Sequence, residues 1–345
     1  MNQVISDIGR RTSLFIEYNH QDITAELKNF ITGWTYTDNL SGEIDDLQIT
    51  LKDRDALWLN DWFPRKGSII KPTLYKTRWA QDELRTKLGE FEIDEITGQG
   101  PPSTITIKAL SITEANSLRG EQKSRAWENT TLKEVASDIA KANGMKLYYQ
   151  SSEVIKKERW EQEGETDLSF LYSICKDAGL CLKLANKTIV ILDEADYEAQ
   201  EPTAIIIRHS KSTDPIKVIS YSFRTSLFDT YAACKVKYHN SRKGVTYSAT
   251  FIPPNVPNNI GRILYINEEV SSNDEAYKLA KKRLREKNKE ATTVTLTVTS
   301  LIHIDAGMTF NLIGFGHING KYIATKVIHR ESNITLQLRR CLEGY

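Results

Sequence analysis

The stretch Thr131-Leu-Lys-Glu-Val-Ala-Ser-Asp-Ile-Ala-Lys-Ala-Asn-Gly-Met-Lys-Leu-Tyr-Tyr149 decides how the middle of this chain is built. It aligns without gaps with Thr166-Asp-Leu-Ser-Phe-Leu-Tyr-Ser-Ile-Cys-Lys-Asp-Ala-Gly-Leu-Cys-Leu-Lys-Leu184, which begins 35 residues later. Each copy has the pattern of a capped helix that runs through a glycine into a strand. The middle of the chain is therefore predicted to contain a duplicated helix and strand unit.

Local signals in the two copies support this prediction. Each copy begins at a threonine whose hydroxyl can accept hydrogen bonds from the first backbone N–H groups of a helix, and Glu134 completes a capping box with Thr131. Gly144 and Gly179 suit the left-handed turn at a helix C-terminus. In each copy apolar residues first recur at helical spacing, at Leu132, Val135, Ala136, Ile139 and Ala140 and at Phe170, Leu171, Ile174, Cys175 and Ala178. After the glycine they alternate with other residues, at Met145, Leu147 and Tyr149 and at Leu180, Leu182 and Leu184. The matched apolar faces are expected to pack on each other.

Composition indicates a soluble globular protein of roughly two to three domains. Of the 345 residues, 40% are apolar and 26% are charged, and 46 basic residues balance 45 acidic ones to a net charge of +1. This balance excludes a strong overall attraction to nucleic acid or anionic membranes. No apolar run approaches the ~20 residues that span a bilayer, and the N-terminus lacks the order of a signal peptide, so synthesis in a cytoplasm is expected. The cysteines, Cys175, Cys181, Cys234 and Cys341, are predicted to be reduced and to serve as small apolar residues.

The region before the repeat is predicted to be an antiparallel β domain, residues 1–117. Apolar and polar residues alternate from about residue 12 to 113, for example at Leu47, Ile49 and Leu51. Asn39-Leu-Ser-Gly-Glu43 and Pro64-Arg-Lys-Gly67 supply turns. Three tryptophans beside the strands are predicted to pack in the core or cover its ends, with binding of an aromatic ligand as the alternative, and they are Trp58, Trp62 and Trp79.

After a small α/β domain at residues 118–200, a second β region is predicted at 201–345. In the small domain, Leu182–Leu184 and Thr188–Leu192 form a hairpin. The second β region is split by a crossover helix at 272–290, for which Ser272 and Glu275 predict a capping box. Acidic residues at the start of this helix and basic residues in its later turns suit the helix dipole. The basic run from Lys278 to Lys289 could contact phosphates. A charged crossover helix is favoured, because it explains the same residues without a phosphate ligand.

Signatures of catalysis are missing, so we predict that the chain is not an enzyme and assign no catalytic, cofactor-binding or metal-binding residue. His303 and Asp305 form an HxD pair on a predicted strand, which is a weak metal signal. The segment Gly314-Phe-Gly-His-Ile-Asn-Gly320 resembles a phosphate loop, but it is expected to be a hairpin turn because no helix follows it. The paired acids would suit glycan cleavage if two converged, yet a solvated face is favoured for Asp45-Asp46 and for Asp94-Glu95.

The order of these regions resembles the late control protein D family, the baseplate hub proteins of contractile phage tails and of defective prophage particles. The residues that carry the resemblance are Tyr36-Thr-Asp-Asn39, Asp45-Asp-Leu-Gln-Ile-Thr-Leu-Lys-Asp-Arg54, Trp160-Glu-Gln-Glu-Gly-Glu-Thr-Asp-Leu-Ser-Phe-Leu171 with Ala178-Gly179, the helix start at Glu275-Ala276, and Gly320-Lys-Tyr-Ile-Ala-Thr-Lys-Val327. The resemblance implies an α+β, mainly β fold with two antiparallel β-barrel tube domains and a small inserted helix and strand domain.

The resemblance also implies a function in the virion, at the baseplate of the tail. Family members form a homotrimer whose two tube domains per chain mimic sixfold symmetry, so that the ring adapts a hexameric tail tube to a trimeric central spike. The partners expected are the tail tube protein, the central spike protein, the tape measure protein and other baseplate proteins, without membrane insertion or specific nucleic acid binding. No cofactor is expected. Exposed sheet edges in a lone chain would favour pairing of strands across subunits.

Two other functions stay open at this level. The segment from Thr131 to Gly144 also resembles the opening helix of a LysM-type module, which would make the chain a peptidoglycan-binding or cell-wall-lytic tail protein. The chain departs from the LysM pattern, because the next helix begins 35 residues after the first and matches it. The other alternative is a DNA-contacting assembly factor that uses the basic helix.

Overall fold

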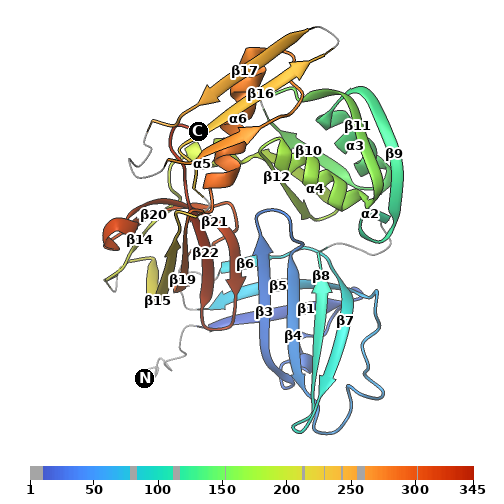
Figure 1. The fold of residues 1–345 in the computed structure, drawn as a ribbon. Helices are drawn as coiled ribbons and strands as arrows, with labels where there is room; N and C mark the ends of the chain where they lie inside the picture. The colour runs from blue at the N-terminus through green and yellow to red at the C-terminus, as the bar shows by residue number, and fades with distance from the viewer. Residues whose placement is uncertain are drawn as a thin grey trace.

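The structure, a computed structural model, describes residues 11–77, 84–111, 117–151, 153–211, 214–228, 230–241, 244–254, 261–300 and 302–345. Figure 1 shows two β regions side by side in the lower half of the molecule and two smaller units above them. Strands predominate over helices, which confirms the predicted α+β, mainly β class. None of the helices in the described ranges is long and apolar enough to cross a membrane.

The first β region alternates between buried and exposed residues as predicted. Its elements are β1 (Arg11–Tyr18), β2 (Gln21–Asp22), α1 (Thr24–Leu27), β3 (Ile31–Asn39), β4 (Asp46–Lys52), β5 (Ile69–Thr77), β6 (Leu84–Lys87), β7 (Phe91–Gln99) and β8 (Thr104–Leu110). Leu47, Ile49 and Leu51 on β4 are buried in one core, and the polar residues between them are less buried. Both predicted turns lie between strands, and Gly42 and Gly67 have the positive φ that glycine permits.

The second β region continues the same sheet. Its elements are β14 (Ala204–Ile207), β15 (Ile216–Thr225), β19 (Thr292–Ser300), β20 (Thr309–Ile313), the short 3-10 helix η1 (Gly316–Ile318), β21 (Gly320–His329) and β22 (Ile334–Arg340). Strand β21 is long enough to pair with β20 at its start and with β3 at its end, where Lys326 lies opposite Asn39 and His329 opposite Tyr36. Among the described residues, 14 strands therefore form one sheet that joins the two predicted β domains. Closure of each region as a barrel stays a prediction, because the described pairings form an open path from β15 to β2.

The duplicated units form the small α/β domain above the first β region (Figure 1). Its elements are α2 (Ser117–Gly120), β9 (Gln122–Thr131), α3 (Leu132–Ala142), β10 (Lys146–Gln150), β11 (Lys156–Thr166), α4 (Asp167–Asp177), β12 (Leu180–Ala185), β13 (Thr188–Asp193) and α5 (Glu194–Ala199). The predicted hairpin of β12 and β13 is present, with Asn186 and Lys187 at positive φ in its turn. Strand β13 also pairs in parallel with β10, so both copies of the repeat share one sheet.

The repeat itself is confirmed in detail. Thr131 accepts a hydrogen bond from the Glu134 N–H at 3.2 Å, and the Glu134 carboxylate accepts one from the Thr131 N–H at 2.8 Å. Thr166 caps α4 in the same way, and Gly144 and Gly179 have φ values of 63° and 74°. All ten helical apolar residues predicted from the spacing are buried in one core with the strands that follow. The apolar faces of α3 and α4 thus pack into a shared core, as expected.

The crossover helix belongs to a separate small unit, which consists of β16 (Ala233–Asn240), β17 (Val245–Phe251), β18 (Ile263–Ile266) and α6 (Asn273–Asn288). Ala276, Ala280 and Leu284 of α6 are buried against this sheet. The sequence did not predict β18. The capping also differs from the prediction, because Ser272 accepts from the Glu275 N–H at 3.1 Å while the Glu275 carboxylate accepts from the Ser271 N–H at 2.7 Å. The boundaries predicted for the three domains stay a prediction.

Candidate assembly interface

Strand β15 is an open edge of the large sheet. Among the described residues it pairs with β19 only, and every position from Ile219 to Thr225 is exposed. Ile219 and Phe223 are 58% and 54% exposed. A long apolar edge strand of this kind offers unpaired backbone groups to another chain.

The register shows that the inner face of β15 is only partly covered, since the Tyr221 ring contacts Phe315 at 5.3 Å between ring centroids and lies under Arg208. Tyr221 lies opposite Leu296 and Phe223 lies opposite Val294, and residues directly opposite on neighbouring strands face the same side of a sheet. Leu296 and Val294 are fully buried in the core, whereas Tyr221 is 39% exposed. The second β region is therefore least covered at Phe223 of β15, and an exposed apolar side chain beside a core is typical of a surface that another protein covers.

A buried ionic cluster joins three parts of the molecule. The Lys183 ammonium on β12 donates to the carboxylate of Asp38 on β3, to the Asn39 carbonyl at 2.7 Å, and to Asp45 at 3.3 Å. Asp38 also accepts a hydrogen bond of 2.7 Å from the Ala306 N–H, which lies between β19 and β20. Asp38 thus connects the first β region, the small α/β domain and the second β region.

Electrostatics in this cluster are unbalanced, because two carboxylates share one ammonium. Burial raises the pKa of Asp45 to about 7 despite the attraction of Lys183, and it also raises the pKa of Asp38. Burial disfavours the Lys183 ammonium, but the attraction of the two carboxylates outweighs it and raises the pKa of Lys183. The cluster therefore holds a proton at near-neutral pH.

The HxD pair lies beside this junction, but not on a strand. His303 and Asp305 occupy the connection between β19 and β20, where their side chains approach to 2.6 Å, and the His303 ring stacks on that of His329. Burial lowers the pKa of His329 to about 3, so this ring is neutral. In the described parts of the chain no group of three or more His, Cys, Asp and Glu residues is arranged to hold a metal ion.

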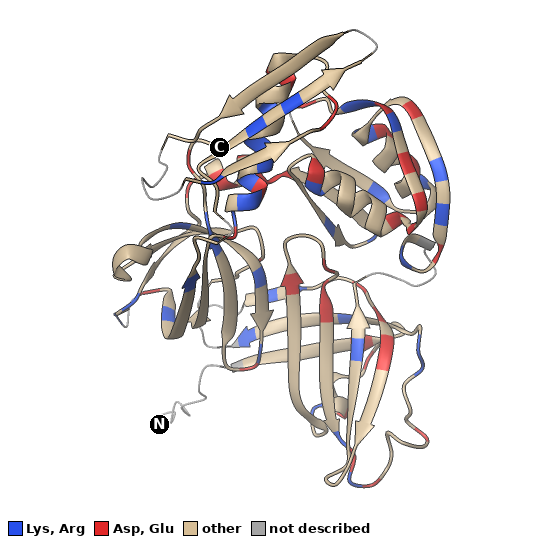
Figure 2. Cartoon of the chain, viewed as in Figure 1, with Lys and Arg blue, Asp and Glu red and all other residues tan. Residues whose placement is uncertain are grey.

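Three basic residues of α6 pair with acids, Lys282, Arg283 and Arg285, and Figure 2 marks the basic positions of this helix in blue. Lys282 contacts Glu153 of the small α/β domain, and Arg283 contacts Asp177 at 2.7 Å. Lys289 lies 2.6 Å from Glu286. The pairs of Lys282 and Arg283 dock the helix on the small α/β domain, so they favour the crossover-helix interpretation of the basic run over phosphate contacts.

A second buried ionic cluster connects α5, α6 and β22. Arg285 contacts Glu194 at 3.2 Å and Glu198 at 2.6 Å, and Arg339 contacts both of the same carboxylates. Burial alone would raise the pKa of Glu194, but the attraction of Arg339, Lys289 and Arg285 lowers it to about 2. Sequence reasoning missed this cluster, because Arg339 stands at a polar position of an alternating strand yet is only 1% exposed.

The prediction of a solvated face was wrong for Asp45. This residue is 5% exposed, because the turn after β3 places its side chain against Lys183 and the Asn39 N–H. Asp94 instead pairs with Arg119 at 3.6 Å, and Asp46 accepts from the Gln48 amide at 3.1 Å. Asp45, Asp46 and Asp94 therefore each have a different partner.

The tryptophans line one end of the first β region. Trp58 is buried in its core, as predicted, and packs edge to face against Phe30 and Trp62. Trp62 is 44% exposed and so covers the end of the core rather than filling it. Trp79 lies outside the described residues.

The remaining candidates have structural positions. The segment from Gly314 to Gly320 connects antiparallel strands, as predicted, but through η1, where the Phe315 N–H donates to the Asn319 side chain at 2.7 Å. All four cysteines are free, and Cys175, Cys181 and Cys234 are buried. Burial raises the pKa of the Cys181 thiol to about 12, which keeps it unreactive. The absence of catalytic, cofactor-binding and metal-binding residues stays a prediction.

Comparison with known proteins identifies relatives over most of the chain. The family model described as phage tail baseplate hub (GPD) matches residues 111–334. The probable baseplate hub protein of Escherichia phage 186 is 30% identical over 183 residues, which are 52% of this chain and 44% of the relative. That of Escherichia phage P2 is 30% identical over 160 residues, 46% of this chain and 39% of the relative. The matches thus span less than half of the length of these relatives.

A solved structure extends the likeness in fold to nearly the whole chain. The 43 kDa tail protein of prophage MuSo2 from Shewanella oneidensis is similar with a TM-score of 0.71 and 15% identity, over 96% of this chain and 98% of that one. Because the family model covers well over half of the residues, the resemblance seen in the sequence is confirmed: the chain belongs to the phage tail baseplate hub (GPD) family.

Proposed function

We propose that this hub protein forms a homotrimeric ring in the baseplate of a contractile phage tail or phage-like particle, where the ring adapts the hexameric tail tube to the trimeric central spike. Its task is structural and not enzymatic. The tail tube and spike proteins are its direct partners, with the tape measure protein and other baseplate proteins nearby.

The observation that carries the proposal is the arrangement of the two β regions. They lie side by side and are joined by the pairing of β3 with β21 inside one chain. Three copies around an axis would present six β regions in a ring, and these six regions suit a sixfold tube on one side. The same ring contains three identical chains, and this threefold symmetry suits a trimeric spike on the other side. The small α/β domain and the unit of α6 lie away from this level (Figure 1).

The contact that closes the ring is proposed to form between β15 of one copy and the first β region of the next. Such a head-to-tail contact uses two different surfaces and closes when its rotation fits the ring. The β15 edge supplies unpaired backbone and exposed Tyr221 and Phe223. Charge favours the same pairing, because acidic residues outnumber basic ones in residues 1–117, whereas basic residues outnumber acidic ones in residues 201–345.

Light scattering of the purified full chain tests the proposal. The unchanged protein is expected to be trimeric at micromolar concentration, and Phe223→Asp is expected to be monomeric, because the substitution places a charge in the covered edge. Tyr148→Asp is the matched control, since Tyr148 is 53% exposed on β10, away from β15, and this variant should stay trimeric. A monodisperse monomer of the unchanged chain, or a trimer of Phe223→Asp, contradicts the proposed ring.

The LysM-like alternative has less support. The apolar residues of the Thr131–Gly144 segment are buried against the second copy of the repeat, and the segment lies inside the range matched by the hub family. We therefore expect no binding in a cell-wall pull-down and no clearing in a zymogram.

A further inference from the structure

A cavity of about 280 Å³ lies inside the first β region, under the connection between β4 and β5. Its walls are aliphatic and come from most strands of this part of the sheet, and six isoleucines line it: Ile16, Ile23, Ile49, Ile70, Ile93 and Ile107. Protein cores seldom contain voids much larger than a water molecule, because the lining atoms lose dispersion contacts. A space of this size is about twice that of the engineered apolar cavity that binds benzene. The cavity therefore has room for one large apolar group.

The mouth of the cavity carries apolar surface beyond the cavity itself. Trp62 and Phe63 line the opening and are 44% and 50% exposed, and the nearby Leu59 is 52% exposed. Edge-to-face contacts of Trp62 with Trp58 and Phe30, at 5.5 and 5.6 Å between ring centroids, fix the aromatic side of the mouth. A small molecule buried in the cavity would leave the rim of Leu59, Trp62 and Phe63 exposed, whereas a protein surface around an inserted side chain would cover it.

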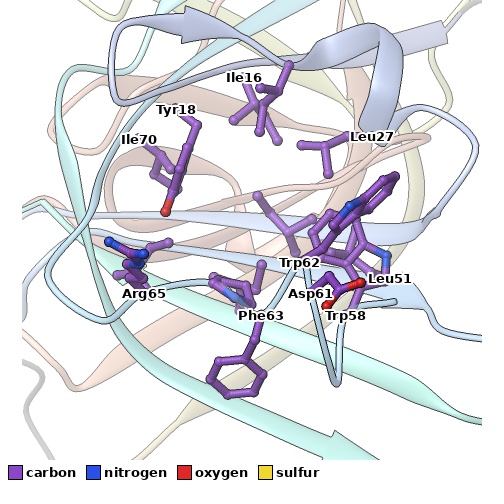
Figure 3. Close-up of a pocket in the computed structure, with 15 residues that line it drawn as sticks. Ile16, Tyr18, Leu27, Leu51, Trp58, Asp61, Trp62, Phe63, Arg65 and Ile70 are labelled. Carbon is purple, nitrogen blue, oxygen red and sulfur yellow. The ribbon is translucent and has the colours of Figure 1, made fainter. Parts of the chain in front are cut away.

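Polar groups of both kinds stand at the same mouth. Figure 3 shows Arg65 on the side of Tyr18 and Ile70, and Asp61 on the opposite side with Trp58. Neither Asp61 nor Arg65 forms an ion pair within the described parts of the chain, and the buried indole N–H of Trp58 has no hydrogen-bond partner there. Arg65 supplies donors for a carbonyl, and Asp61 supplies an acceptor for an N–H. A peptide backbone offers that carbonyl and N–H pair and so uses both groups, whereas a fatty acid carboxylate could pair with Arg65 but has no N–H to donate to Asp61.

From the cavity, its rim and these polar groups we infer that this site is an anchor pocket for a peptide segment of another tail protein. The segment inserts one large apolar side chain, such as leucine or phenylalanine, and its backbone rests between Arg65 and Asp61. This inference rests on the proposed function only in taking the partner to be a tail protein. The site lies in the first β region and is distinct from the open edge of β15.

Blocked amino acid amides are the smallest probes of this recognition. The full chain, labelled at isoleucine δ1 methyl groups, is titrated with N-acetyl-phenylalanine amide, N-acetyl-leucine amide and N-acetyl-glycine amide and followed by methyl NMR. The first two are expected to shift the methyl resonances of the six cavity isoleucines saturably, with dissociation constants of ~1 mM, because only one side chain is buried. The glycine amide is expected to shift none of them. Decanoate and a β15 peptide of this chain, added in separate titrations, represent the other two occupants.

Variants separate the pocket from its surroundings. Arg65→Gln should weaken binding about fivefold, the effect of one lost hydrogen bond, while Arg54→Gln, an exposed arginine of the same connection outside the cavity, should change nothing. Ile23→Trp should fill the cavity and abolish the shifts with no loss of melting temperature. Light scattering of Ile23→Trp should still show a trimer, so failure of the pocket is distinguishable from failure of the ring.

The inference is overturned by any of three results. The phenylalanine and leucine amides leave the cavity methyls unshifted at ~10 mM, a concentration well above the expected dissociation constant. Decanoate or the β15 peptide binds there more tightly than either amide. Ile23→Trp binds the amides as well as the unchanged chain does, which would place their site elsewhere.

Discussion

Replacement of Lys183 by methionine tests the buried cluster that joins the three parts of the molecule. Methionine keeps most of the length and the apolar stem of lysine but removes the only ammonium that contacts both Asp38 and Asp45 in the described structure. These carboxylates are 4% and 6% exposed in their side chains, so neither can recover full hydration. The variant must either keep an unpaired buried charge or bind a further proton.

The magnitude follows from the protonation that the variant needs. Asp45 already holds a proton near neutral pH, since its pKa is about 7, so the added cost falls mainly on Asp38. Protonating one carboxyl group of ordinary pKa ~3.9 costs about 4 kcal/mol at pH 7 and about 1.5 kcal/mol at pH 5. The first figure agrees with the 3–5 kcal/mol, roughly, that breaking a buried ion pair costs. We expect Lys183→Met to destabilise by about 4 kcal/mol at pH 7 and by less than half of that at pH 5.

The sign of this pH dependence can be checked against the unchanged protein. The pKa of Asp45 is raised by folding, so the stability it contributes is full below its ordinary pKa and is lost as the pH rises through about 7. Acid therefore relieves the strain of the excess carboxylate in the unchanged chain and relieves more of it in the variant. Because the relief in the variant is the larger of the two, the difference in unfolding free energy between the two proteins narrows at low pH.

Urea unfolding followed by tryptophan fluorescence and circular dichroism measures the effect at both pH values. Lys187→Met is the matched control, because Lys187 lies on the same hairpin, is 60% exposed in its side chain and pairs with Glu90 at the surface. A surface pair of this kind contributes roughly 0–1 kcal/mol, with little change between the two pH values. An effect of Lys183→Met below about 1 kcal/mol at pH 7, or one equal at pH 5 and pH 7, would refute the reasoning.

Three further outcomes are expected. Arg339→Met should destabilise by roughly 3–5 kcal/mol, because Glu194 and Glu198 are left buried with one guanidinium fewer, and a melting temperature within about 2 °C of the unchanged chain would argue against this. Since folding lowers the pKa of Glu194 to about 2, the stability that this group contributes is present above its ordinary pKa of 4.5 and should disappear as the pH falls towards 2, as thermal melts in acid would show. Gly179→Ala should cost about 1–2 kcal/mol because its φ is 74°, whereas Gly120→Ala, which has open space and no positive φ, should cost less than about 0.5 kcal/mol in the same denaturation assay.

The elements that the sequence predicted well depend on neighbours along the chain. The capping box of Thr131 and Glu134, the left-handed glycines after α3 and α4 and the turn at Asn186 and Lys187 each involve residues within one or two turns of backbone. Their hydrogen bonds form whenever the local conformation forms, so residue type and spacing are enough to predict them. The shared core of the repeat followed from the same logic, since two matched apolar faces must be buried.

The candidate site was less accessible from the sequence. Asp45 was predicted to be solvated and Arg339 had no assigned role, because the charges that compensate them lie far away in the chain, on Lys183 and Glu194. The open edge of β15 was also hidden, since its alternating residues look the same whether or not another strand covers them.

The sequence by itself determined the three long helices α3, α4 and α6, most strands, the duplicated unit and the family of this protein, because periodicity, caps and turns are short-range properties. Only the tertiary structure decided that β3 pairs with β21, that Lys183 holds Asp38 and Asp45, and that Tyr221 and Phe223 remain exposed. The physical reason is that any strand offers the same row of backbone donors and acceptors to any neighbour. Which neighbour it takes, and which edge is left open, depends on how surfaces distant in sequence fit together.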